Sequence, residues 1–186
     1  MRLFLLLWVS LAIPLRAQND FHACFGTETM IEGGQVEKLT VVNSNLMFTI
    51  RPPKGWYRQM DDASRKIMFT APSGKSAVTI QFTTNSPGQL PPRDVLQEQA
   101  QQAHPGAGIV QCAVCPTSCQ PGLFFDLVRM PDPGVLQRTR HAFVSQPAGQ
   151  VEFVLSASDD EFDNYRNVIM AMLRDFRVEP LKHKRP

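Results

Sequence analysis

The chain has 186 residues, of which 43% are hydrophobic, and it carries 19 Lys and Arg against 17 Asp and Glu. This length suits a single domain with a sizeable core. Two of the basic residues, Arg2 and Arg16, lie in a segment that we expect to be removed. The rest of the chain is charge-balanced, which excludes a nucleic-acid partner.

The first 17 residues have the pattern of a secretory signal. Arg2 supplies a positive start, residues 3–15 supply an apolar run, and Ala17 offers a small residue for cleavage. The run is shorter than the ~20 residues that span a bilayer, which argues against the alternative of a membrane anchor. The sequence therefore predicts an exported protein, periplasmic or extracellular, that is not attached to a membrane once the signal has been cleaved.

The next part of the chain changes from polar to strand-forming. Residues 18–35 are polar and small with no clear period, which predicts a flexible lead-in. The β-branched and apolar runs at residues 36–42 and 46–50 predict two strands. Pro52-Pro53-Lys54-Gly55 then ends the second strand, and Trp56-Tyr57 follow as amphipathic residues at a core edge.

A hairpin and a helix come next. Residues 66–70 and 77–83 predict two strands joined by a turn, and the second strand alternates cleanly between apolar and polar residues. Residues 93–103 place apolar side chains on one helical stripe, and His104-Pro105-Gly106 ends the helix.

The second half predicts more strands and a closing helix. Residues 109–112 form a short strand, and residues 123–157 form a three-stranded meander. Ser158-Asp159-Asp160-Glu161 is a capping box, in which Ser158 caps the helix and Glu161 reaches back to it. We prefer capping to a metal site here, because consecutive acids on a helix point to different faces.

The order of elements is strands, helix, strands, helix. It predicts one α+β domain at residues 36–179, in which two main helices cover an antiparallel sheet. A basic tail at residues 180–186 follows the domain.

One segment resembles a known group. Phe48-Thr49-Ile50-Arg51-Pro52-Pro53-Lys54-Gly55-Trp56 resembles the strand followed by P-x-G-W that opens proteins of the PsbP-like superfamily, and the order of elements over residues 40–178 is similar. The resemblance implies an α/β/α sandwich. It also implies an accessory or binding protein, because members of the group do not share one chemistry.

Four cysteines, Cys24, Cys112, Cys115 and Cys119, give an even count in a chain expected to be exported. Two structural disulfides are the leading interpretation, with three connectivities open. One hypothesis pairs Cys119 with Cys112 or Cys115 and leaves the other thiol for Cys24.

Two alternatives use the same cysteines. Cys112 and Cys115 form a C-x-x-C motif, but a redox pair needs its first thiol at a helix N-terminus, and Cys112 follows a predicted strand. A metal site would combine Cys112, Cys115 and Cys119 with Cys24 or His104, but oxidation competes with thiolate ligation in the expected compartment. Attachment of c-type haem is excluded, because Pro116 stands where the motif needs His.

Charged residues offer one further candidate site. Arg138 and Arg140 share a face of a predicted strand, and Arg129 lies on its hairpin partner, so the three could form an anion-binding surface. A solvated face is the preferred interpretation. His141, on the other face of that strand, is expected to be a half-exposed sheet residue rather than a base.

No catalytic residue, cofactor or metal is therefore expected. Gly74-Lys75-Ser76 resembles the end of a phosphate loop, but Phe69 stands where that motif needs Gly. The leading prediction is an exported, non-enzymatic binding or accessory domain, monomeric, with an unknown protein or small ligand as partner. The alternative is a thiol–disulfide redox protein that uses Cys112 and Cys115.

Overall fold

The computed structural model describes residues 21–83, 88–118, 121–147 and 149–181. The expected signal at residues 1–17, Cys119 and the end of the basic tail lie outside these ranges.

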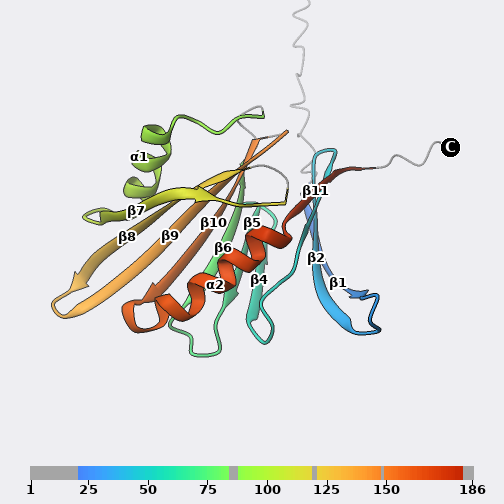
Figure 1. Ribbon diagram of the computed structural model, residues 1–186, viewed down its shortest axis with the longest axis horizontal. Helices are drawn as coiled ribbons and strands as arrows, with labels where there is room; N and C mark the ends of the chain where they lie inside the picture. The colour runs from blue at the N-terminus through green and yellow to red at the C-terminus, as the bar shows by residue number, and fades with distance from the viewer. Residues whose placement is uncertain (1–20, 84–87, 119–120, 148, 182–186) are drawn as a thin grey trace, which may run out of the picture.

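A seven-stranded antiparallel sheet dominates the structure (Figure 1). Across the sheet, the strands are β4 (Tyr57–Asp61), β5 (Lys66–Thr70), β6 (Ala77–Thr83), β10 (Gly149–Ser158), β9 (Val135–Gln146), β8 (Gly122–Asp132) and β7 (Gly108–Cys115). Strands that follow one another along the chain pair with each other in two groups, β4-β5-β6 and β7-β8-β9-β10. The pairing of β6 with β10 joins these groups.

A smaller antiparallel sheet lies beside helix α2 (Figure 1). Its strands, in order, are β1 (His22–Thr29), β2 (Gln35–Asn43), β3 (Leu46–Ile50) and β11 (Arg177–Pro180). Strand β11 follows α2 and pairs with β3, so the end of the described chain joins the sheet that its first three strands form.

The two helices lie on opposite faces of the large sheet. Helix α2 (Asp159–Asp175) contacts β9, β10 and β3. Helix α1 (Arg93–Ala103) contacts β8 on the other face and packs through Leu96 and Ala100. The sheet therefore separates two apolar clusters.

The larger cluster fills the space between the large sheet, α2 and the small sheet. Aromatic side chains link these layers: Phe48 of β3 lies 5.2 Å from Phe82 of β6 and 5.9 Å from Phe176 after α2, measured between ring centroids. All three side chains are almost completely buried. Each such ring contributes about 1.5–3 kcal/mol by leaving water, so the small sheet is a full part of the core.

The structure confirms an α+β fold with two helices and antiparallel sheets, and it confirms the meander as β8-β9-β10. The expected sandwich, with a helix layer over each face, is only partly correct. On one face α2 shares the space with the small sheet, and on the other α1 packs on the β7–β9 side.

The interpretation of residues 18–35 as a flexible lead-in is wrong for residues 22–29, which form β1. Strand β1 pairs with β2 along its whole length, and Phe21 and Ala23 reach the core. A tight turn joins the two strands: the Met30 N–H donates to the Gly34 carbonyl oxygen at 2.7 Å, and Gly33 has φ +87°. The polar residues of β1 are exposed.

Ser158 is the N-cap residue of α2, as predicted, but the reciprocal bonds of a capping box are absent. The carboxylate of Glu161 instead accepts hydrogen bonds from the hydroxyls of Ser76 at 2.5 Å and Ser73 at 3.2 Å. These serines lie in the turn between β5 and β6, so Glu161 ties α2 to that turn.

Candidate functional site

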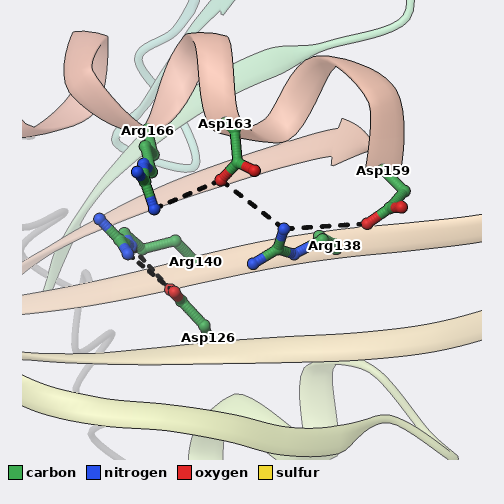
Figure 2. A network of polar contacts seen from close by, with 6 residues as sticks. All are labelled: Asp126, Arg138, Arg140, Asp159, Asp163 and Arg166. Atoms are coloured by element: carbon green, nitrogen blue, oxygen red, sulfur yellow. Dashed lines mark hydrogen bonds and ion pairs between the residues drawn. The ribbon is translucent and has the colours of Figure 1, made fainter.

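The guanidinium group of Arg140 is buried beneath α2. It donates through Nε and Nη2 to the two carboxylate oxygens of Asp126, at 2.6 and 2.7 Å (Figure 2). Asp126 and Arg140 are direct partners across β8 and β9, and they are 1% and 5% exposed. The guanidinium carbon also lies 4.2 Å from the ring centroid of Phe124. Arg140 is therefore a paired core residue and not part of an open surface.

Arg138 lies two residues away on the same face and faces the start of α2 (Figure 2). Its Nη1 lies 3.8 Å from an oxygen of Asp159 and 3.7 Å from one of Asp163. Its guanidinium carbon lies 4.2 Å from the ring centroid of Phe162. Negative charge is favourable at a helix N-terminus, so Asp159 stabilises the start of α2 and also forms an ion pair with Arg138.

Arg129 lies on the opposite face of the large sheet. It is the direct cross-strand partner of Gln137, and partners in a ladder share a face, whereas Arg138 pairs with Val128 on the other face. The Arg129 Nε donates to the Gln137 Oε1 at 2.7 Å. The structure thus does not bring the three predicted arginines together, because spacing along β9 does not fix the face of a residue on β8.

His141 is 2% exposed, so the prediction of a half-exposed histidine is wrong. Its Nδ1 lies 2.6 Å from the Glu152 Oε1, and its ring lies 5.0 Å from that of His104. Burial, followed by the electrostatic effects of the neighbouring His141 and Arg129, lowers the pKa of His104, while Glu152 partly opposes the shift. His104 is the C-cap residue of α1, so these contacts lie at the end of that helix.

Cys112 and Cys115 both lie in β7, which is longer than the predicted strand. Three residues of extended strand span about 10 Å and place the first and last side chains on opposite faces. Cys115 accordingly belongs to the larger cluster and Cys112 packs against the smaller one. A disulfide needs Cα atoms closer than about 7 Å, so this strand cannot form the Cys112–Cys115 redox pair.

The described cysteines Cys24, Cys112 and Cys115 are free thiols in the structure. Burial raises the pKa of Cys115 to about 11, which makes it a poor nucleophile. Cys24 is exposed on β1. The two-disulfide interpretation depends on Cys119, outside the described residues, and stays a prediction. Among the described residues, no group of three or more His, Cys, Asp or Glu is placed to hold a metal ion.

A hollow of about 310 Å³ opens between residues 51–56, which we call the 51–56 loop, and helix α2. We call this space the Trp56 hollow. Trp56 is half-buried, and its ring meets that of Tyr165 edge-on with centroids 5.0 Å apart. That contact fixes one wall by packing. The apolar lining comes from both segments: Pro52, Pro53, Trp56, Val168, Ala171 and Met172.

Three charged side chains, Arg51, Lys54 and Asp175, complete the lining of the Trp56 hollow. The Arg51 Nη1 lies 3.5 Å from an oxygen of Asp175. A second hollow of about 430 Å³ shares Pro52 and Lys54 with it, and a third, of about 110 Å³, shares Arg51 and Asp175. Three adjoining hollows therefore surround the 51–56 loop.

This arrangement suits binding. Ligand sites are usually hollows of about 300–1,000 Å³ with apolar walls and a few polar groups that fix orientation. The Trp56 hollow has this character, at the small end of the range. The sequence marked the loop as a fold landmark but could not reveal the hollow, because Val168 and Ala171 reach it from a helix far along the chain.

The two antiparallel sheets and the two helices define a PsbP-like fold. The chain is similar to the solution structure of cyanobacterial PsbP (CyanoP) from Synechocystis sp. PCC 6803, with a TM-score of 0.50 and 10% identity over 83% of this chain and 92% of that chain. It is also similar to LpqN, involved in cell envelope biogenesis of Mycobacterium tuberculosis, with a TM-score of 0.49 and 14% identity over 86% and 92%. No family model and no curated protein matches the chain. At these identities the likeness concerns the fold alone.

Proposed function

We propose that this protein is an exported, non-enzymatic binding or accessory domain, and that the Trp56 hollow is its binding site. The observation that carries the proposal is the apolar lining of that hollow, built from a proline-rich loop, a packed tryptophan and one face of α2. The partner would insert an apolar group between Pro53 and Ala171, with Arg51, Lys54 and Asp175 at hand for polar contacts.

The chemistry of the surroundings favours binding over catalysis. Catalytic groups usually have strongly shifted pKa values and lie in a cleft. The charged groups of the Trp56 hollow include a partly exposed ion pair, Arg51 with Asp175, of a kind that contributes only about 0–1 kcal/mol. The two most buried shifted groups, Cys115 and His104, lie in β7 and at the end of α1, not in the lining.

The signal-like start of the chain supports export to the periplasm or the extracellular space. No helix in the described part of the chain is long and apolar enough to cross a membrane. The redox alternative loses its support because Cys112 and Cys115 point to opposite faces of β7.

Tryptophan fluorescence tests the proposed site directly. The chain contains two tryptophans, Trp8 and Trp56, and Trp8 lies in the expected signal, so the protein without residues 1–17 reports on the Trp56 hollow alone. The probe is 8-anilinonaphthalene-1-sulfonate, an apolar double ring with one anionic group. We expect saturable quenching of Trp56 fluorescence, weakened at least tenfold by Ala171→Arg, because the new side chain fills the hollow.

Ala171 is exposed and Arg is a good helix former, so the variant should fold normally. Gln101→Arg, at an exposed position of α1, is the matched control with the same charge change and should bind the probe as the parent does. Equal binding by both variants would reject the Trp56 hollow as the site. A turnover abolished by changing one residue of the hollow would reject the non-enzymatic assignment.

A further inference from the structure

Strand β7 ends the seven-stranded sheet (Figure 1). It is eight residues long and pairs with β8 on one side, and no described strand pairs with its other side. An edge strand of this length presents a row of backbone N–H and C=O groups that can pair with another strand.

The side chains of β7 do nothing to block such pairing. The strand contains no charged residue and no proline. Val110 and Val114 are 60% and 63% exposed. Val114 lies in the regular part of the strand, while Val110 lies at an irregularity in the pairing with β8. Proteins usually protect exposed edges with charges or prolines, because apolar edges associate.

The edge strands β4 and β11 are protected in this way. Strand β4 carries Arg58 and Asp61, and Arg58 lies 3.7 Å from Glu37 of the small sheet. Strand β11 contains Arg177 and Glu179 within four residues and ends at a proline. The remaining edge strand, β1, contains Glu28 near its end, whereas β7 contains no charged residue at all. The contrast with β4 and β11 indicates that β7 is left open for a partner.

We propose that β7 is the contact of a homodimer, in which the β7 strands of two copies pair antiparallel about a two-fold axis and join the two large sheets. The backbone of an open edge requires an extended strand as its partner, and β7 itself is one. Like charges opposite each other destabilise a sheet, and two uncharged β7 strands bring none together. The exposed valines of both copies then share one apolar seam. This proposal replaces the expectation of a monomer and does not depend on the Trp56 hollow.

The contact is small, which sets the expected affinity. A pair of eight-residue strands buries less than the ~1,200 Å² of a standard interface, so we expect a dissociation constant of about 10 μM. Sedimentation equilibrium of the full chain from about 1 μM to 1 mM should show a monomer becoming a dimer across that range.

Substitutions at Val114 test the proposal. Val114→Lys places two charges along the shared edge and should raise the dissociation constant at least thirtyfold, whereas Val114→Thr keeps an uncharged strand former and should change it less than threefold. Val135→Lys is the matched control, since Val135 is 51% exposed and begins β9 inside the sheet. Circular dichroism and the melting temperature identify any variant that fails to fold.

Hydrogen exchange gives a second measurement that needs no variant. Amides of β7 that face away from β8 should exchange more slowly at high protein concentration, while those of β4 should not change. A parent protein that remains monomeric at 1 mM would overturn the proposal. So would equal dimerisation of the Val114→Lys and Val135→Lys proteins.

Discussion

The buried pair of Asp126 and Arg140 allows a quantitative test of what stabilises the layer beneath α2. Both side chains are almost completely removed from water, and two short hydrogen bonds satisfy their charges. Removing one partner of such a pair leaves an uncompensated charge in the core, which costs about 3–5 kcal/mol. Whole domains are stable by only about 5–15 kcal/mol, so either single change should remove much of the stability.

The variants are Asp126→Leu, Arg140→Met and the double replacement. Each single variant should lose about 3–5 kcal/mol of unfolding free energy, whereas the double variant should lose far less than the sum, because well-packed apolar side chains can replace a buried ion pair. Methionine also keeps the contact with Phe124, since a thioether packs well against an aromatic ring. Urea denaturation, fitted with one m-value for all variants, measures the three changes in unfolding free energy.

An exposed pair provides the control. Arg166 and Asp163 lie 3.3 Å apart on α2, with side chains 50% and 63% exposed. Arg166→Met should therefore change the unfolding free energy by less than about 1 kcal/mol. The reasoning fails if the single variants at Asp126 and Arg140 also lose less than this, or if the double variant loses the sum of the two.

Three further predictions concern other buried contacts. Gly122→Ala should lower the unfolding free energy by about 1–3 kcal/mol, because the added Cβ would lie 2.6 Å from the Phe143 carbonyl oxygen and 2.7 Å from the Cys115 sulfur. Gly26→Ala, at a position with open space around it, should not lower the unfolding free energy. Burial raises the pKa of Cys115 from 9.0 to about 11, so the stability gained by burying its protonated thiol should be complete below pH 9 and be lost toward pH 11. Iodoacetamide should modify Cys115 far more slowly than it modifies the exposed Cys24 of β1. In an NMR titration, His104 should titrate below 6.5, and Arg129→Gln should raise its pKa by removing a positive charge.

The sequence predicted the elements whose residues alternate or repeat strongly. Strand β6 shows a clear two-residue period, and α2 shows a regular apolar stripe. Strand β4 was missed because its five residues are all exposed and give no alternation. Strand β11 was missed because it is only four residues long and gains its partner β3 from the start of the domain.

The candidate site depended on information that a linear pattern does not contain. The face of Arg129 relative to Arg138 is set by the register between β8 and β9, which no single strand reveals. The burial of Arg140 depends on α2 lying over it. The Trp56 hollow exists only because the 51–56 loop and α2 meet in the folded chain. The one local signal was the tryptophan after a proline-rich turn, which the resemblance to PsbP-like proteins had marked.

The position of α1 has a consequence for the dynamics of the protein. The helix is attached through two fully buried side chains, Leu96 and Ala100, and no side chain caps its N-terminus. It belongs to the small apolar cluster, while β1, β3 and α2 share the large one on the other side of the sheet. A segment held by so few buried contacts opens at a lower free energy than the whole domain. Helix α1 is therefore expected to detach and return while the rest of the protein stays folded, which would transiently expose Phe125 and Phe143 to solvent.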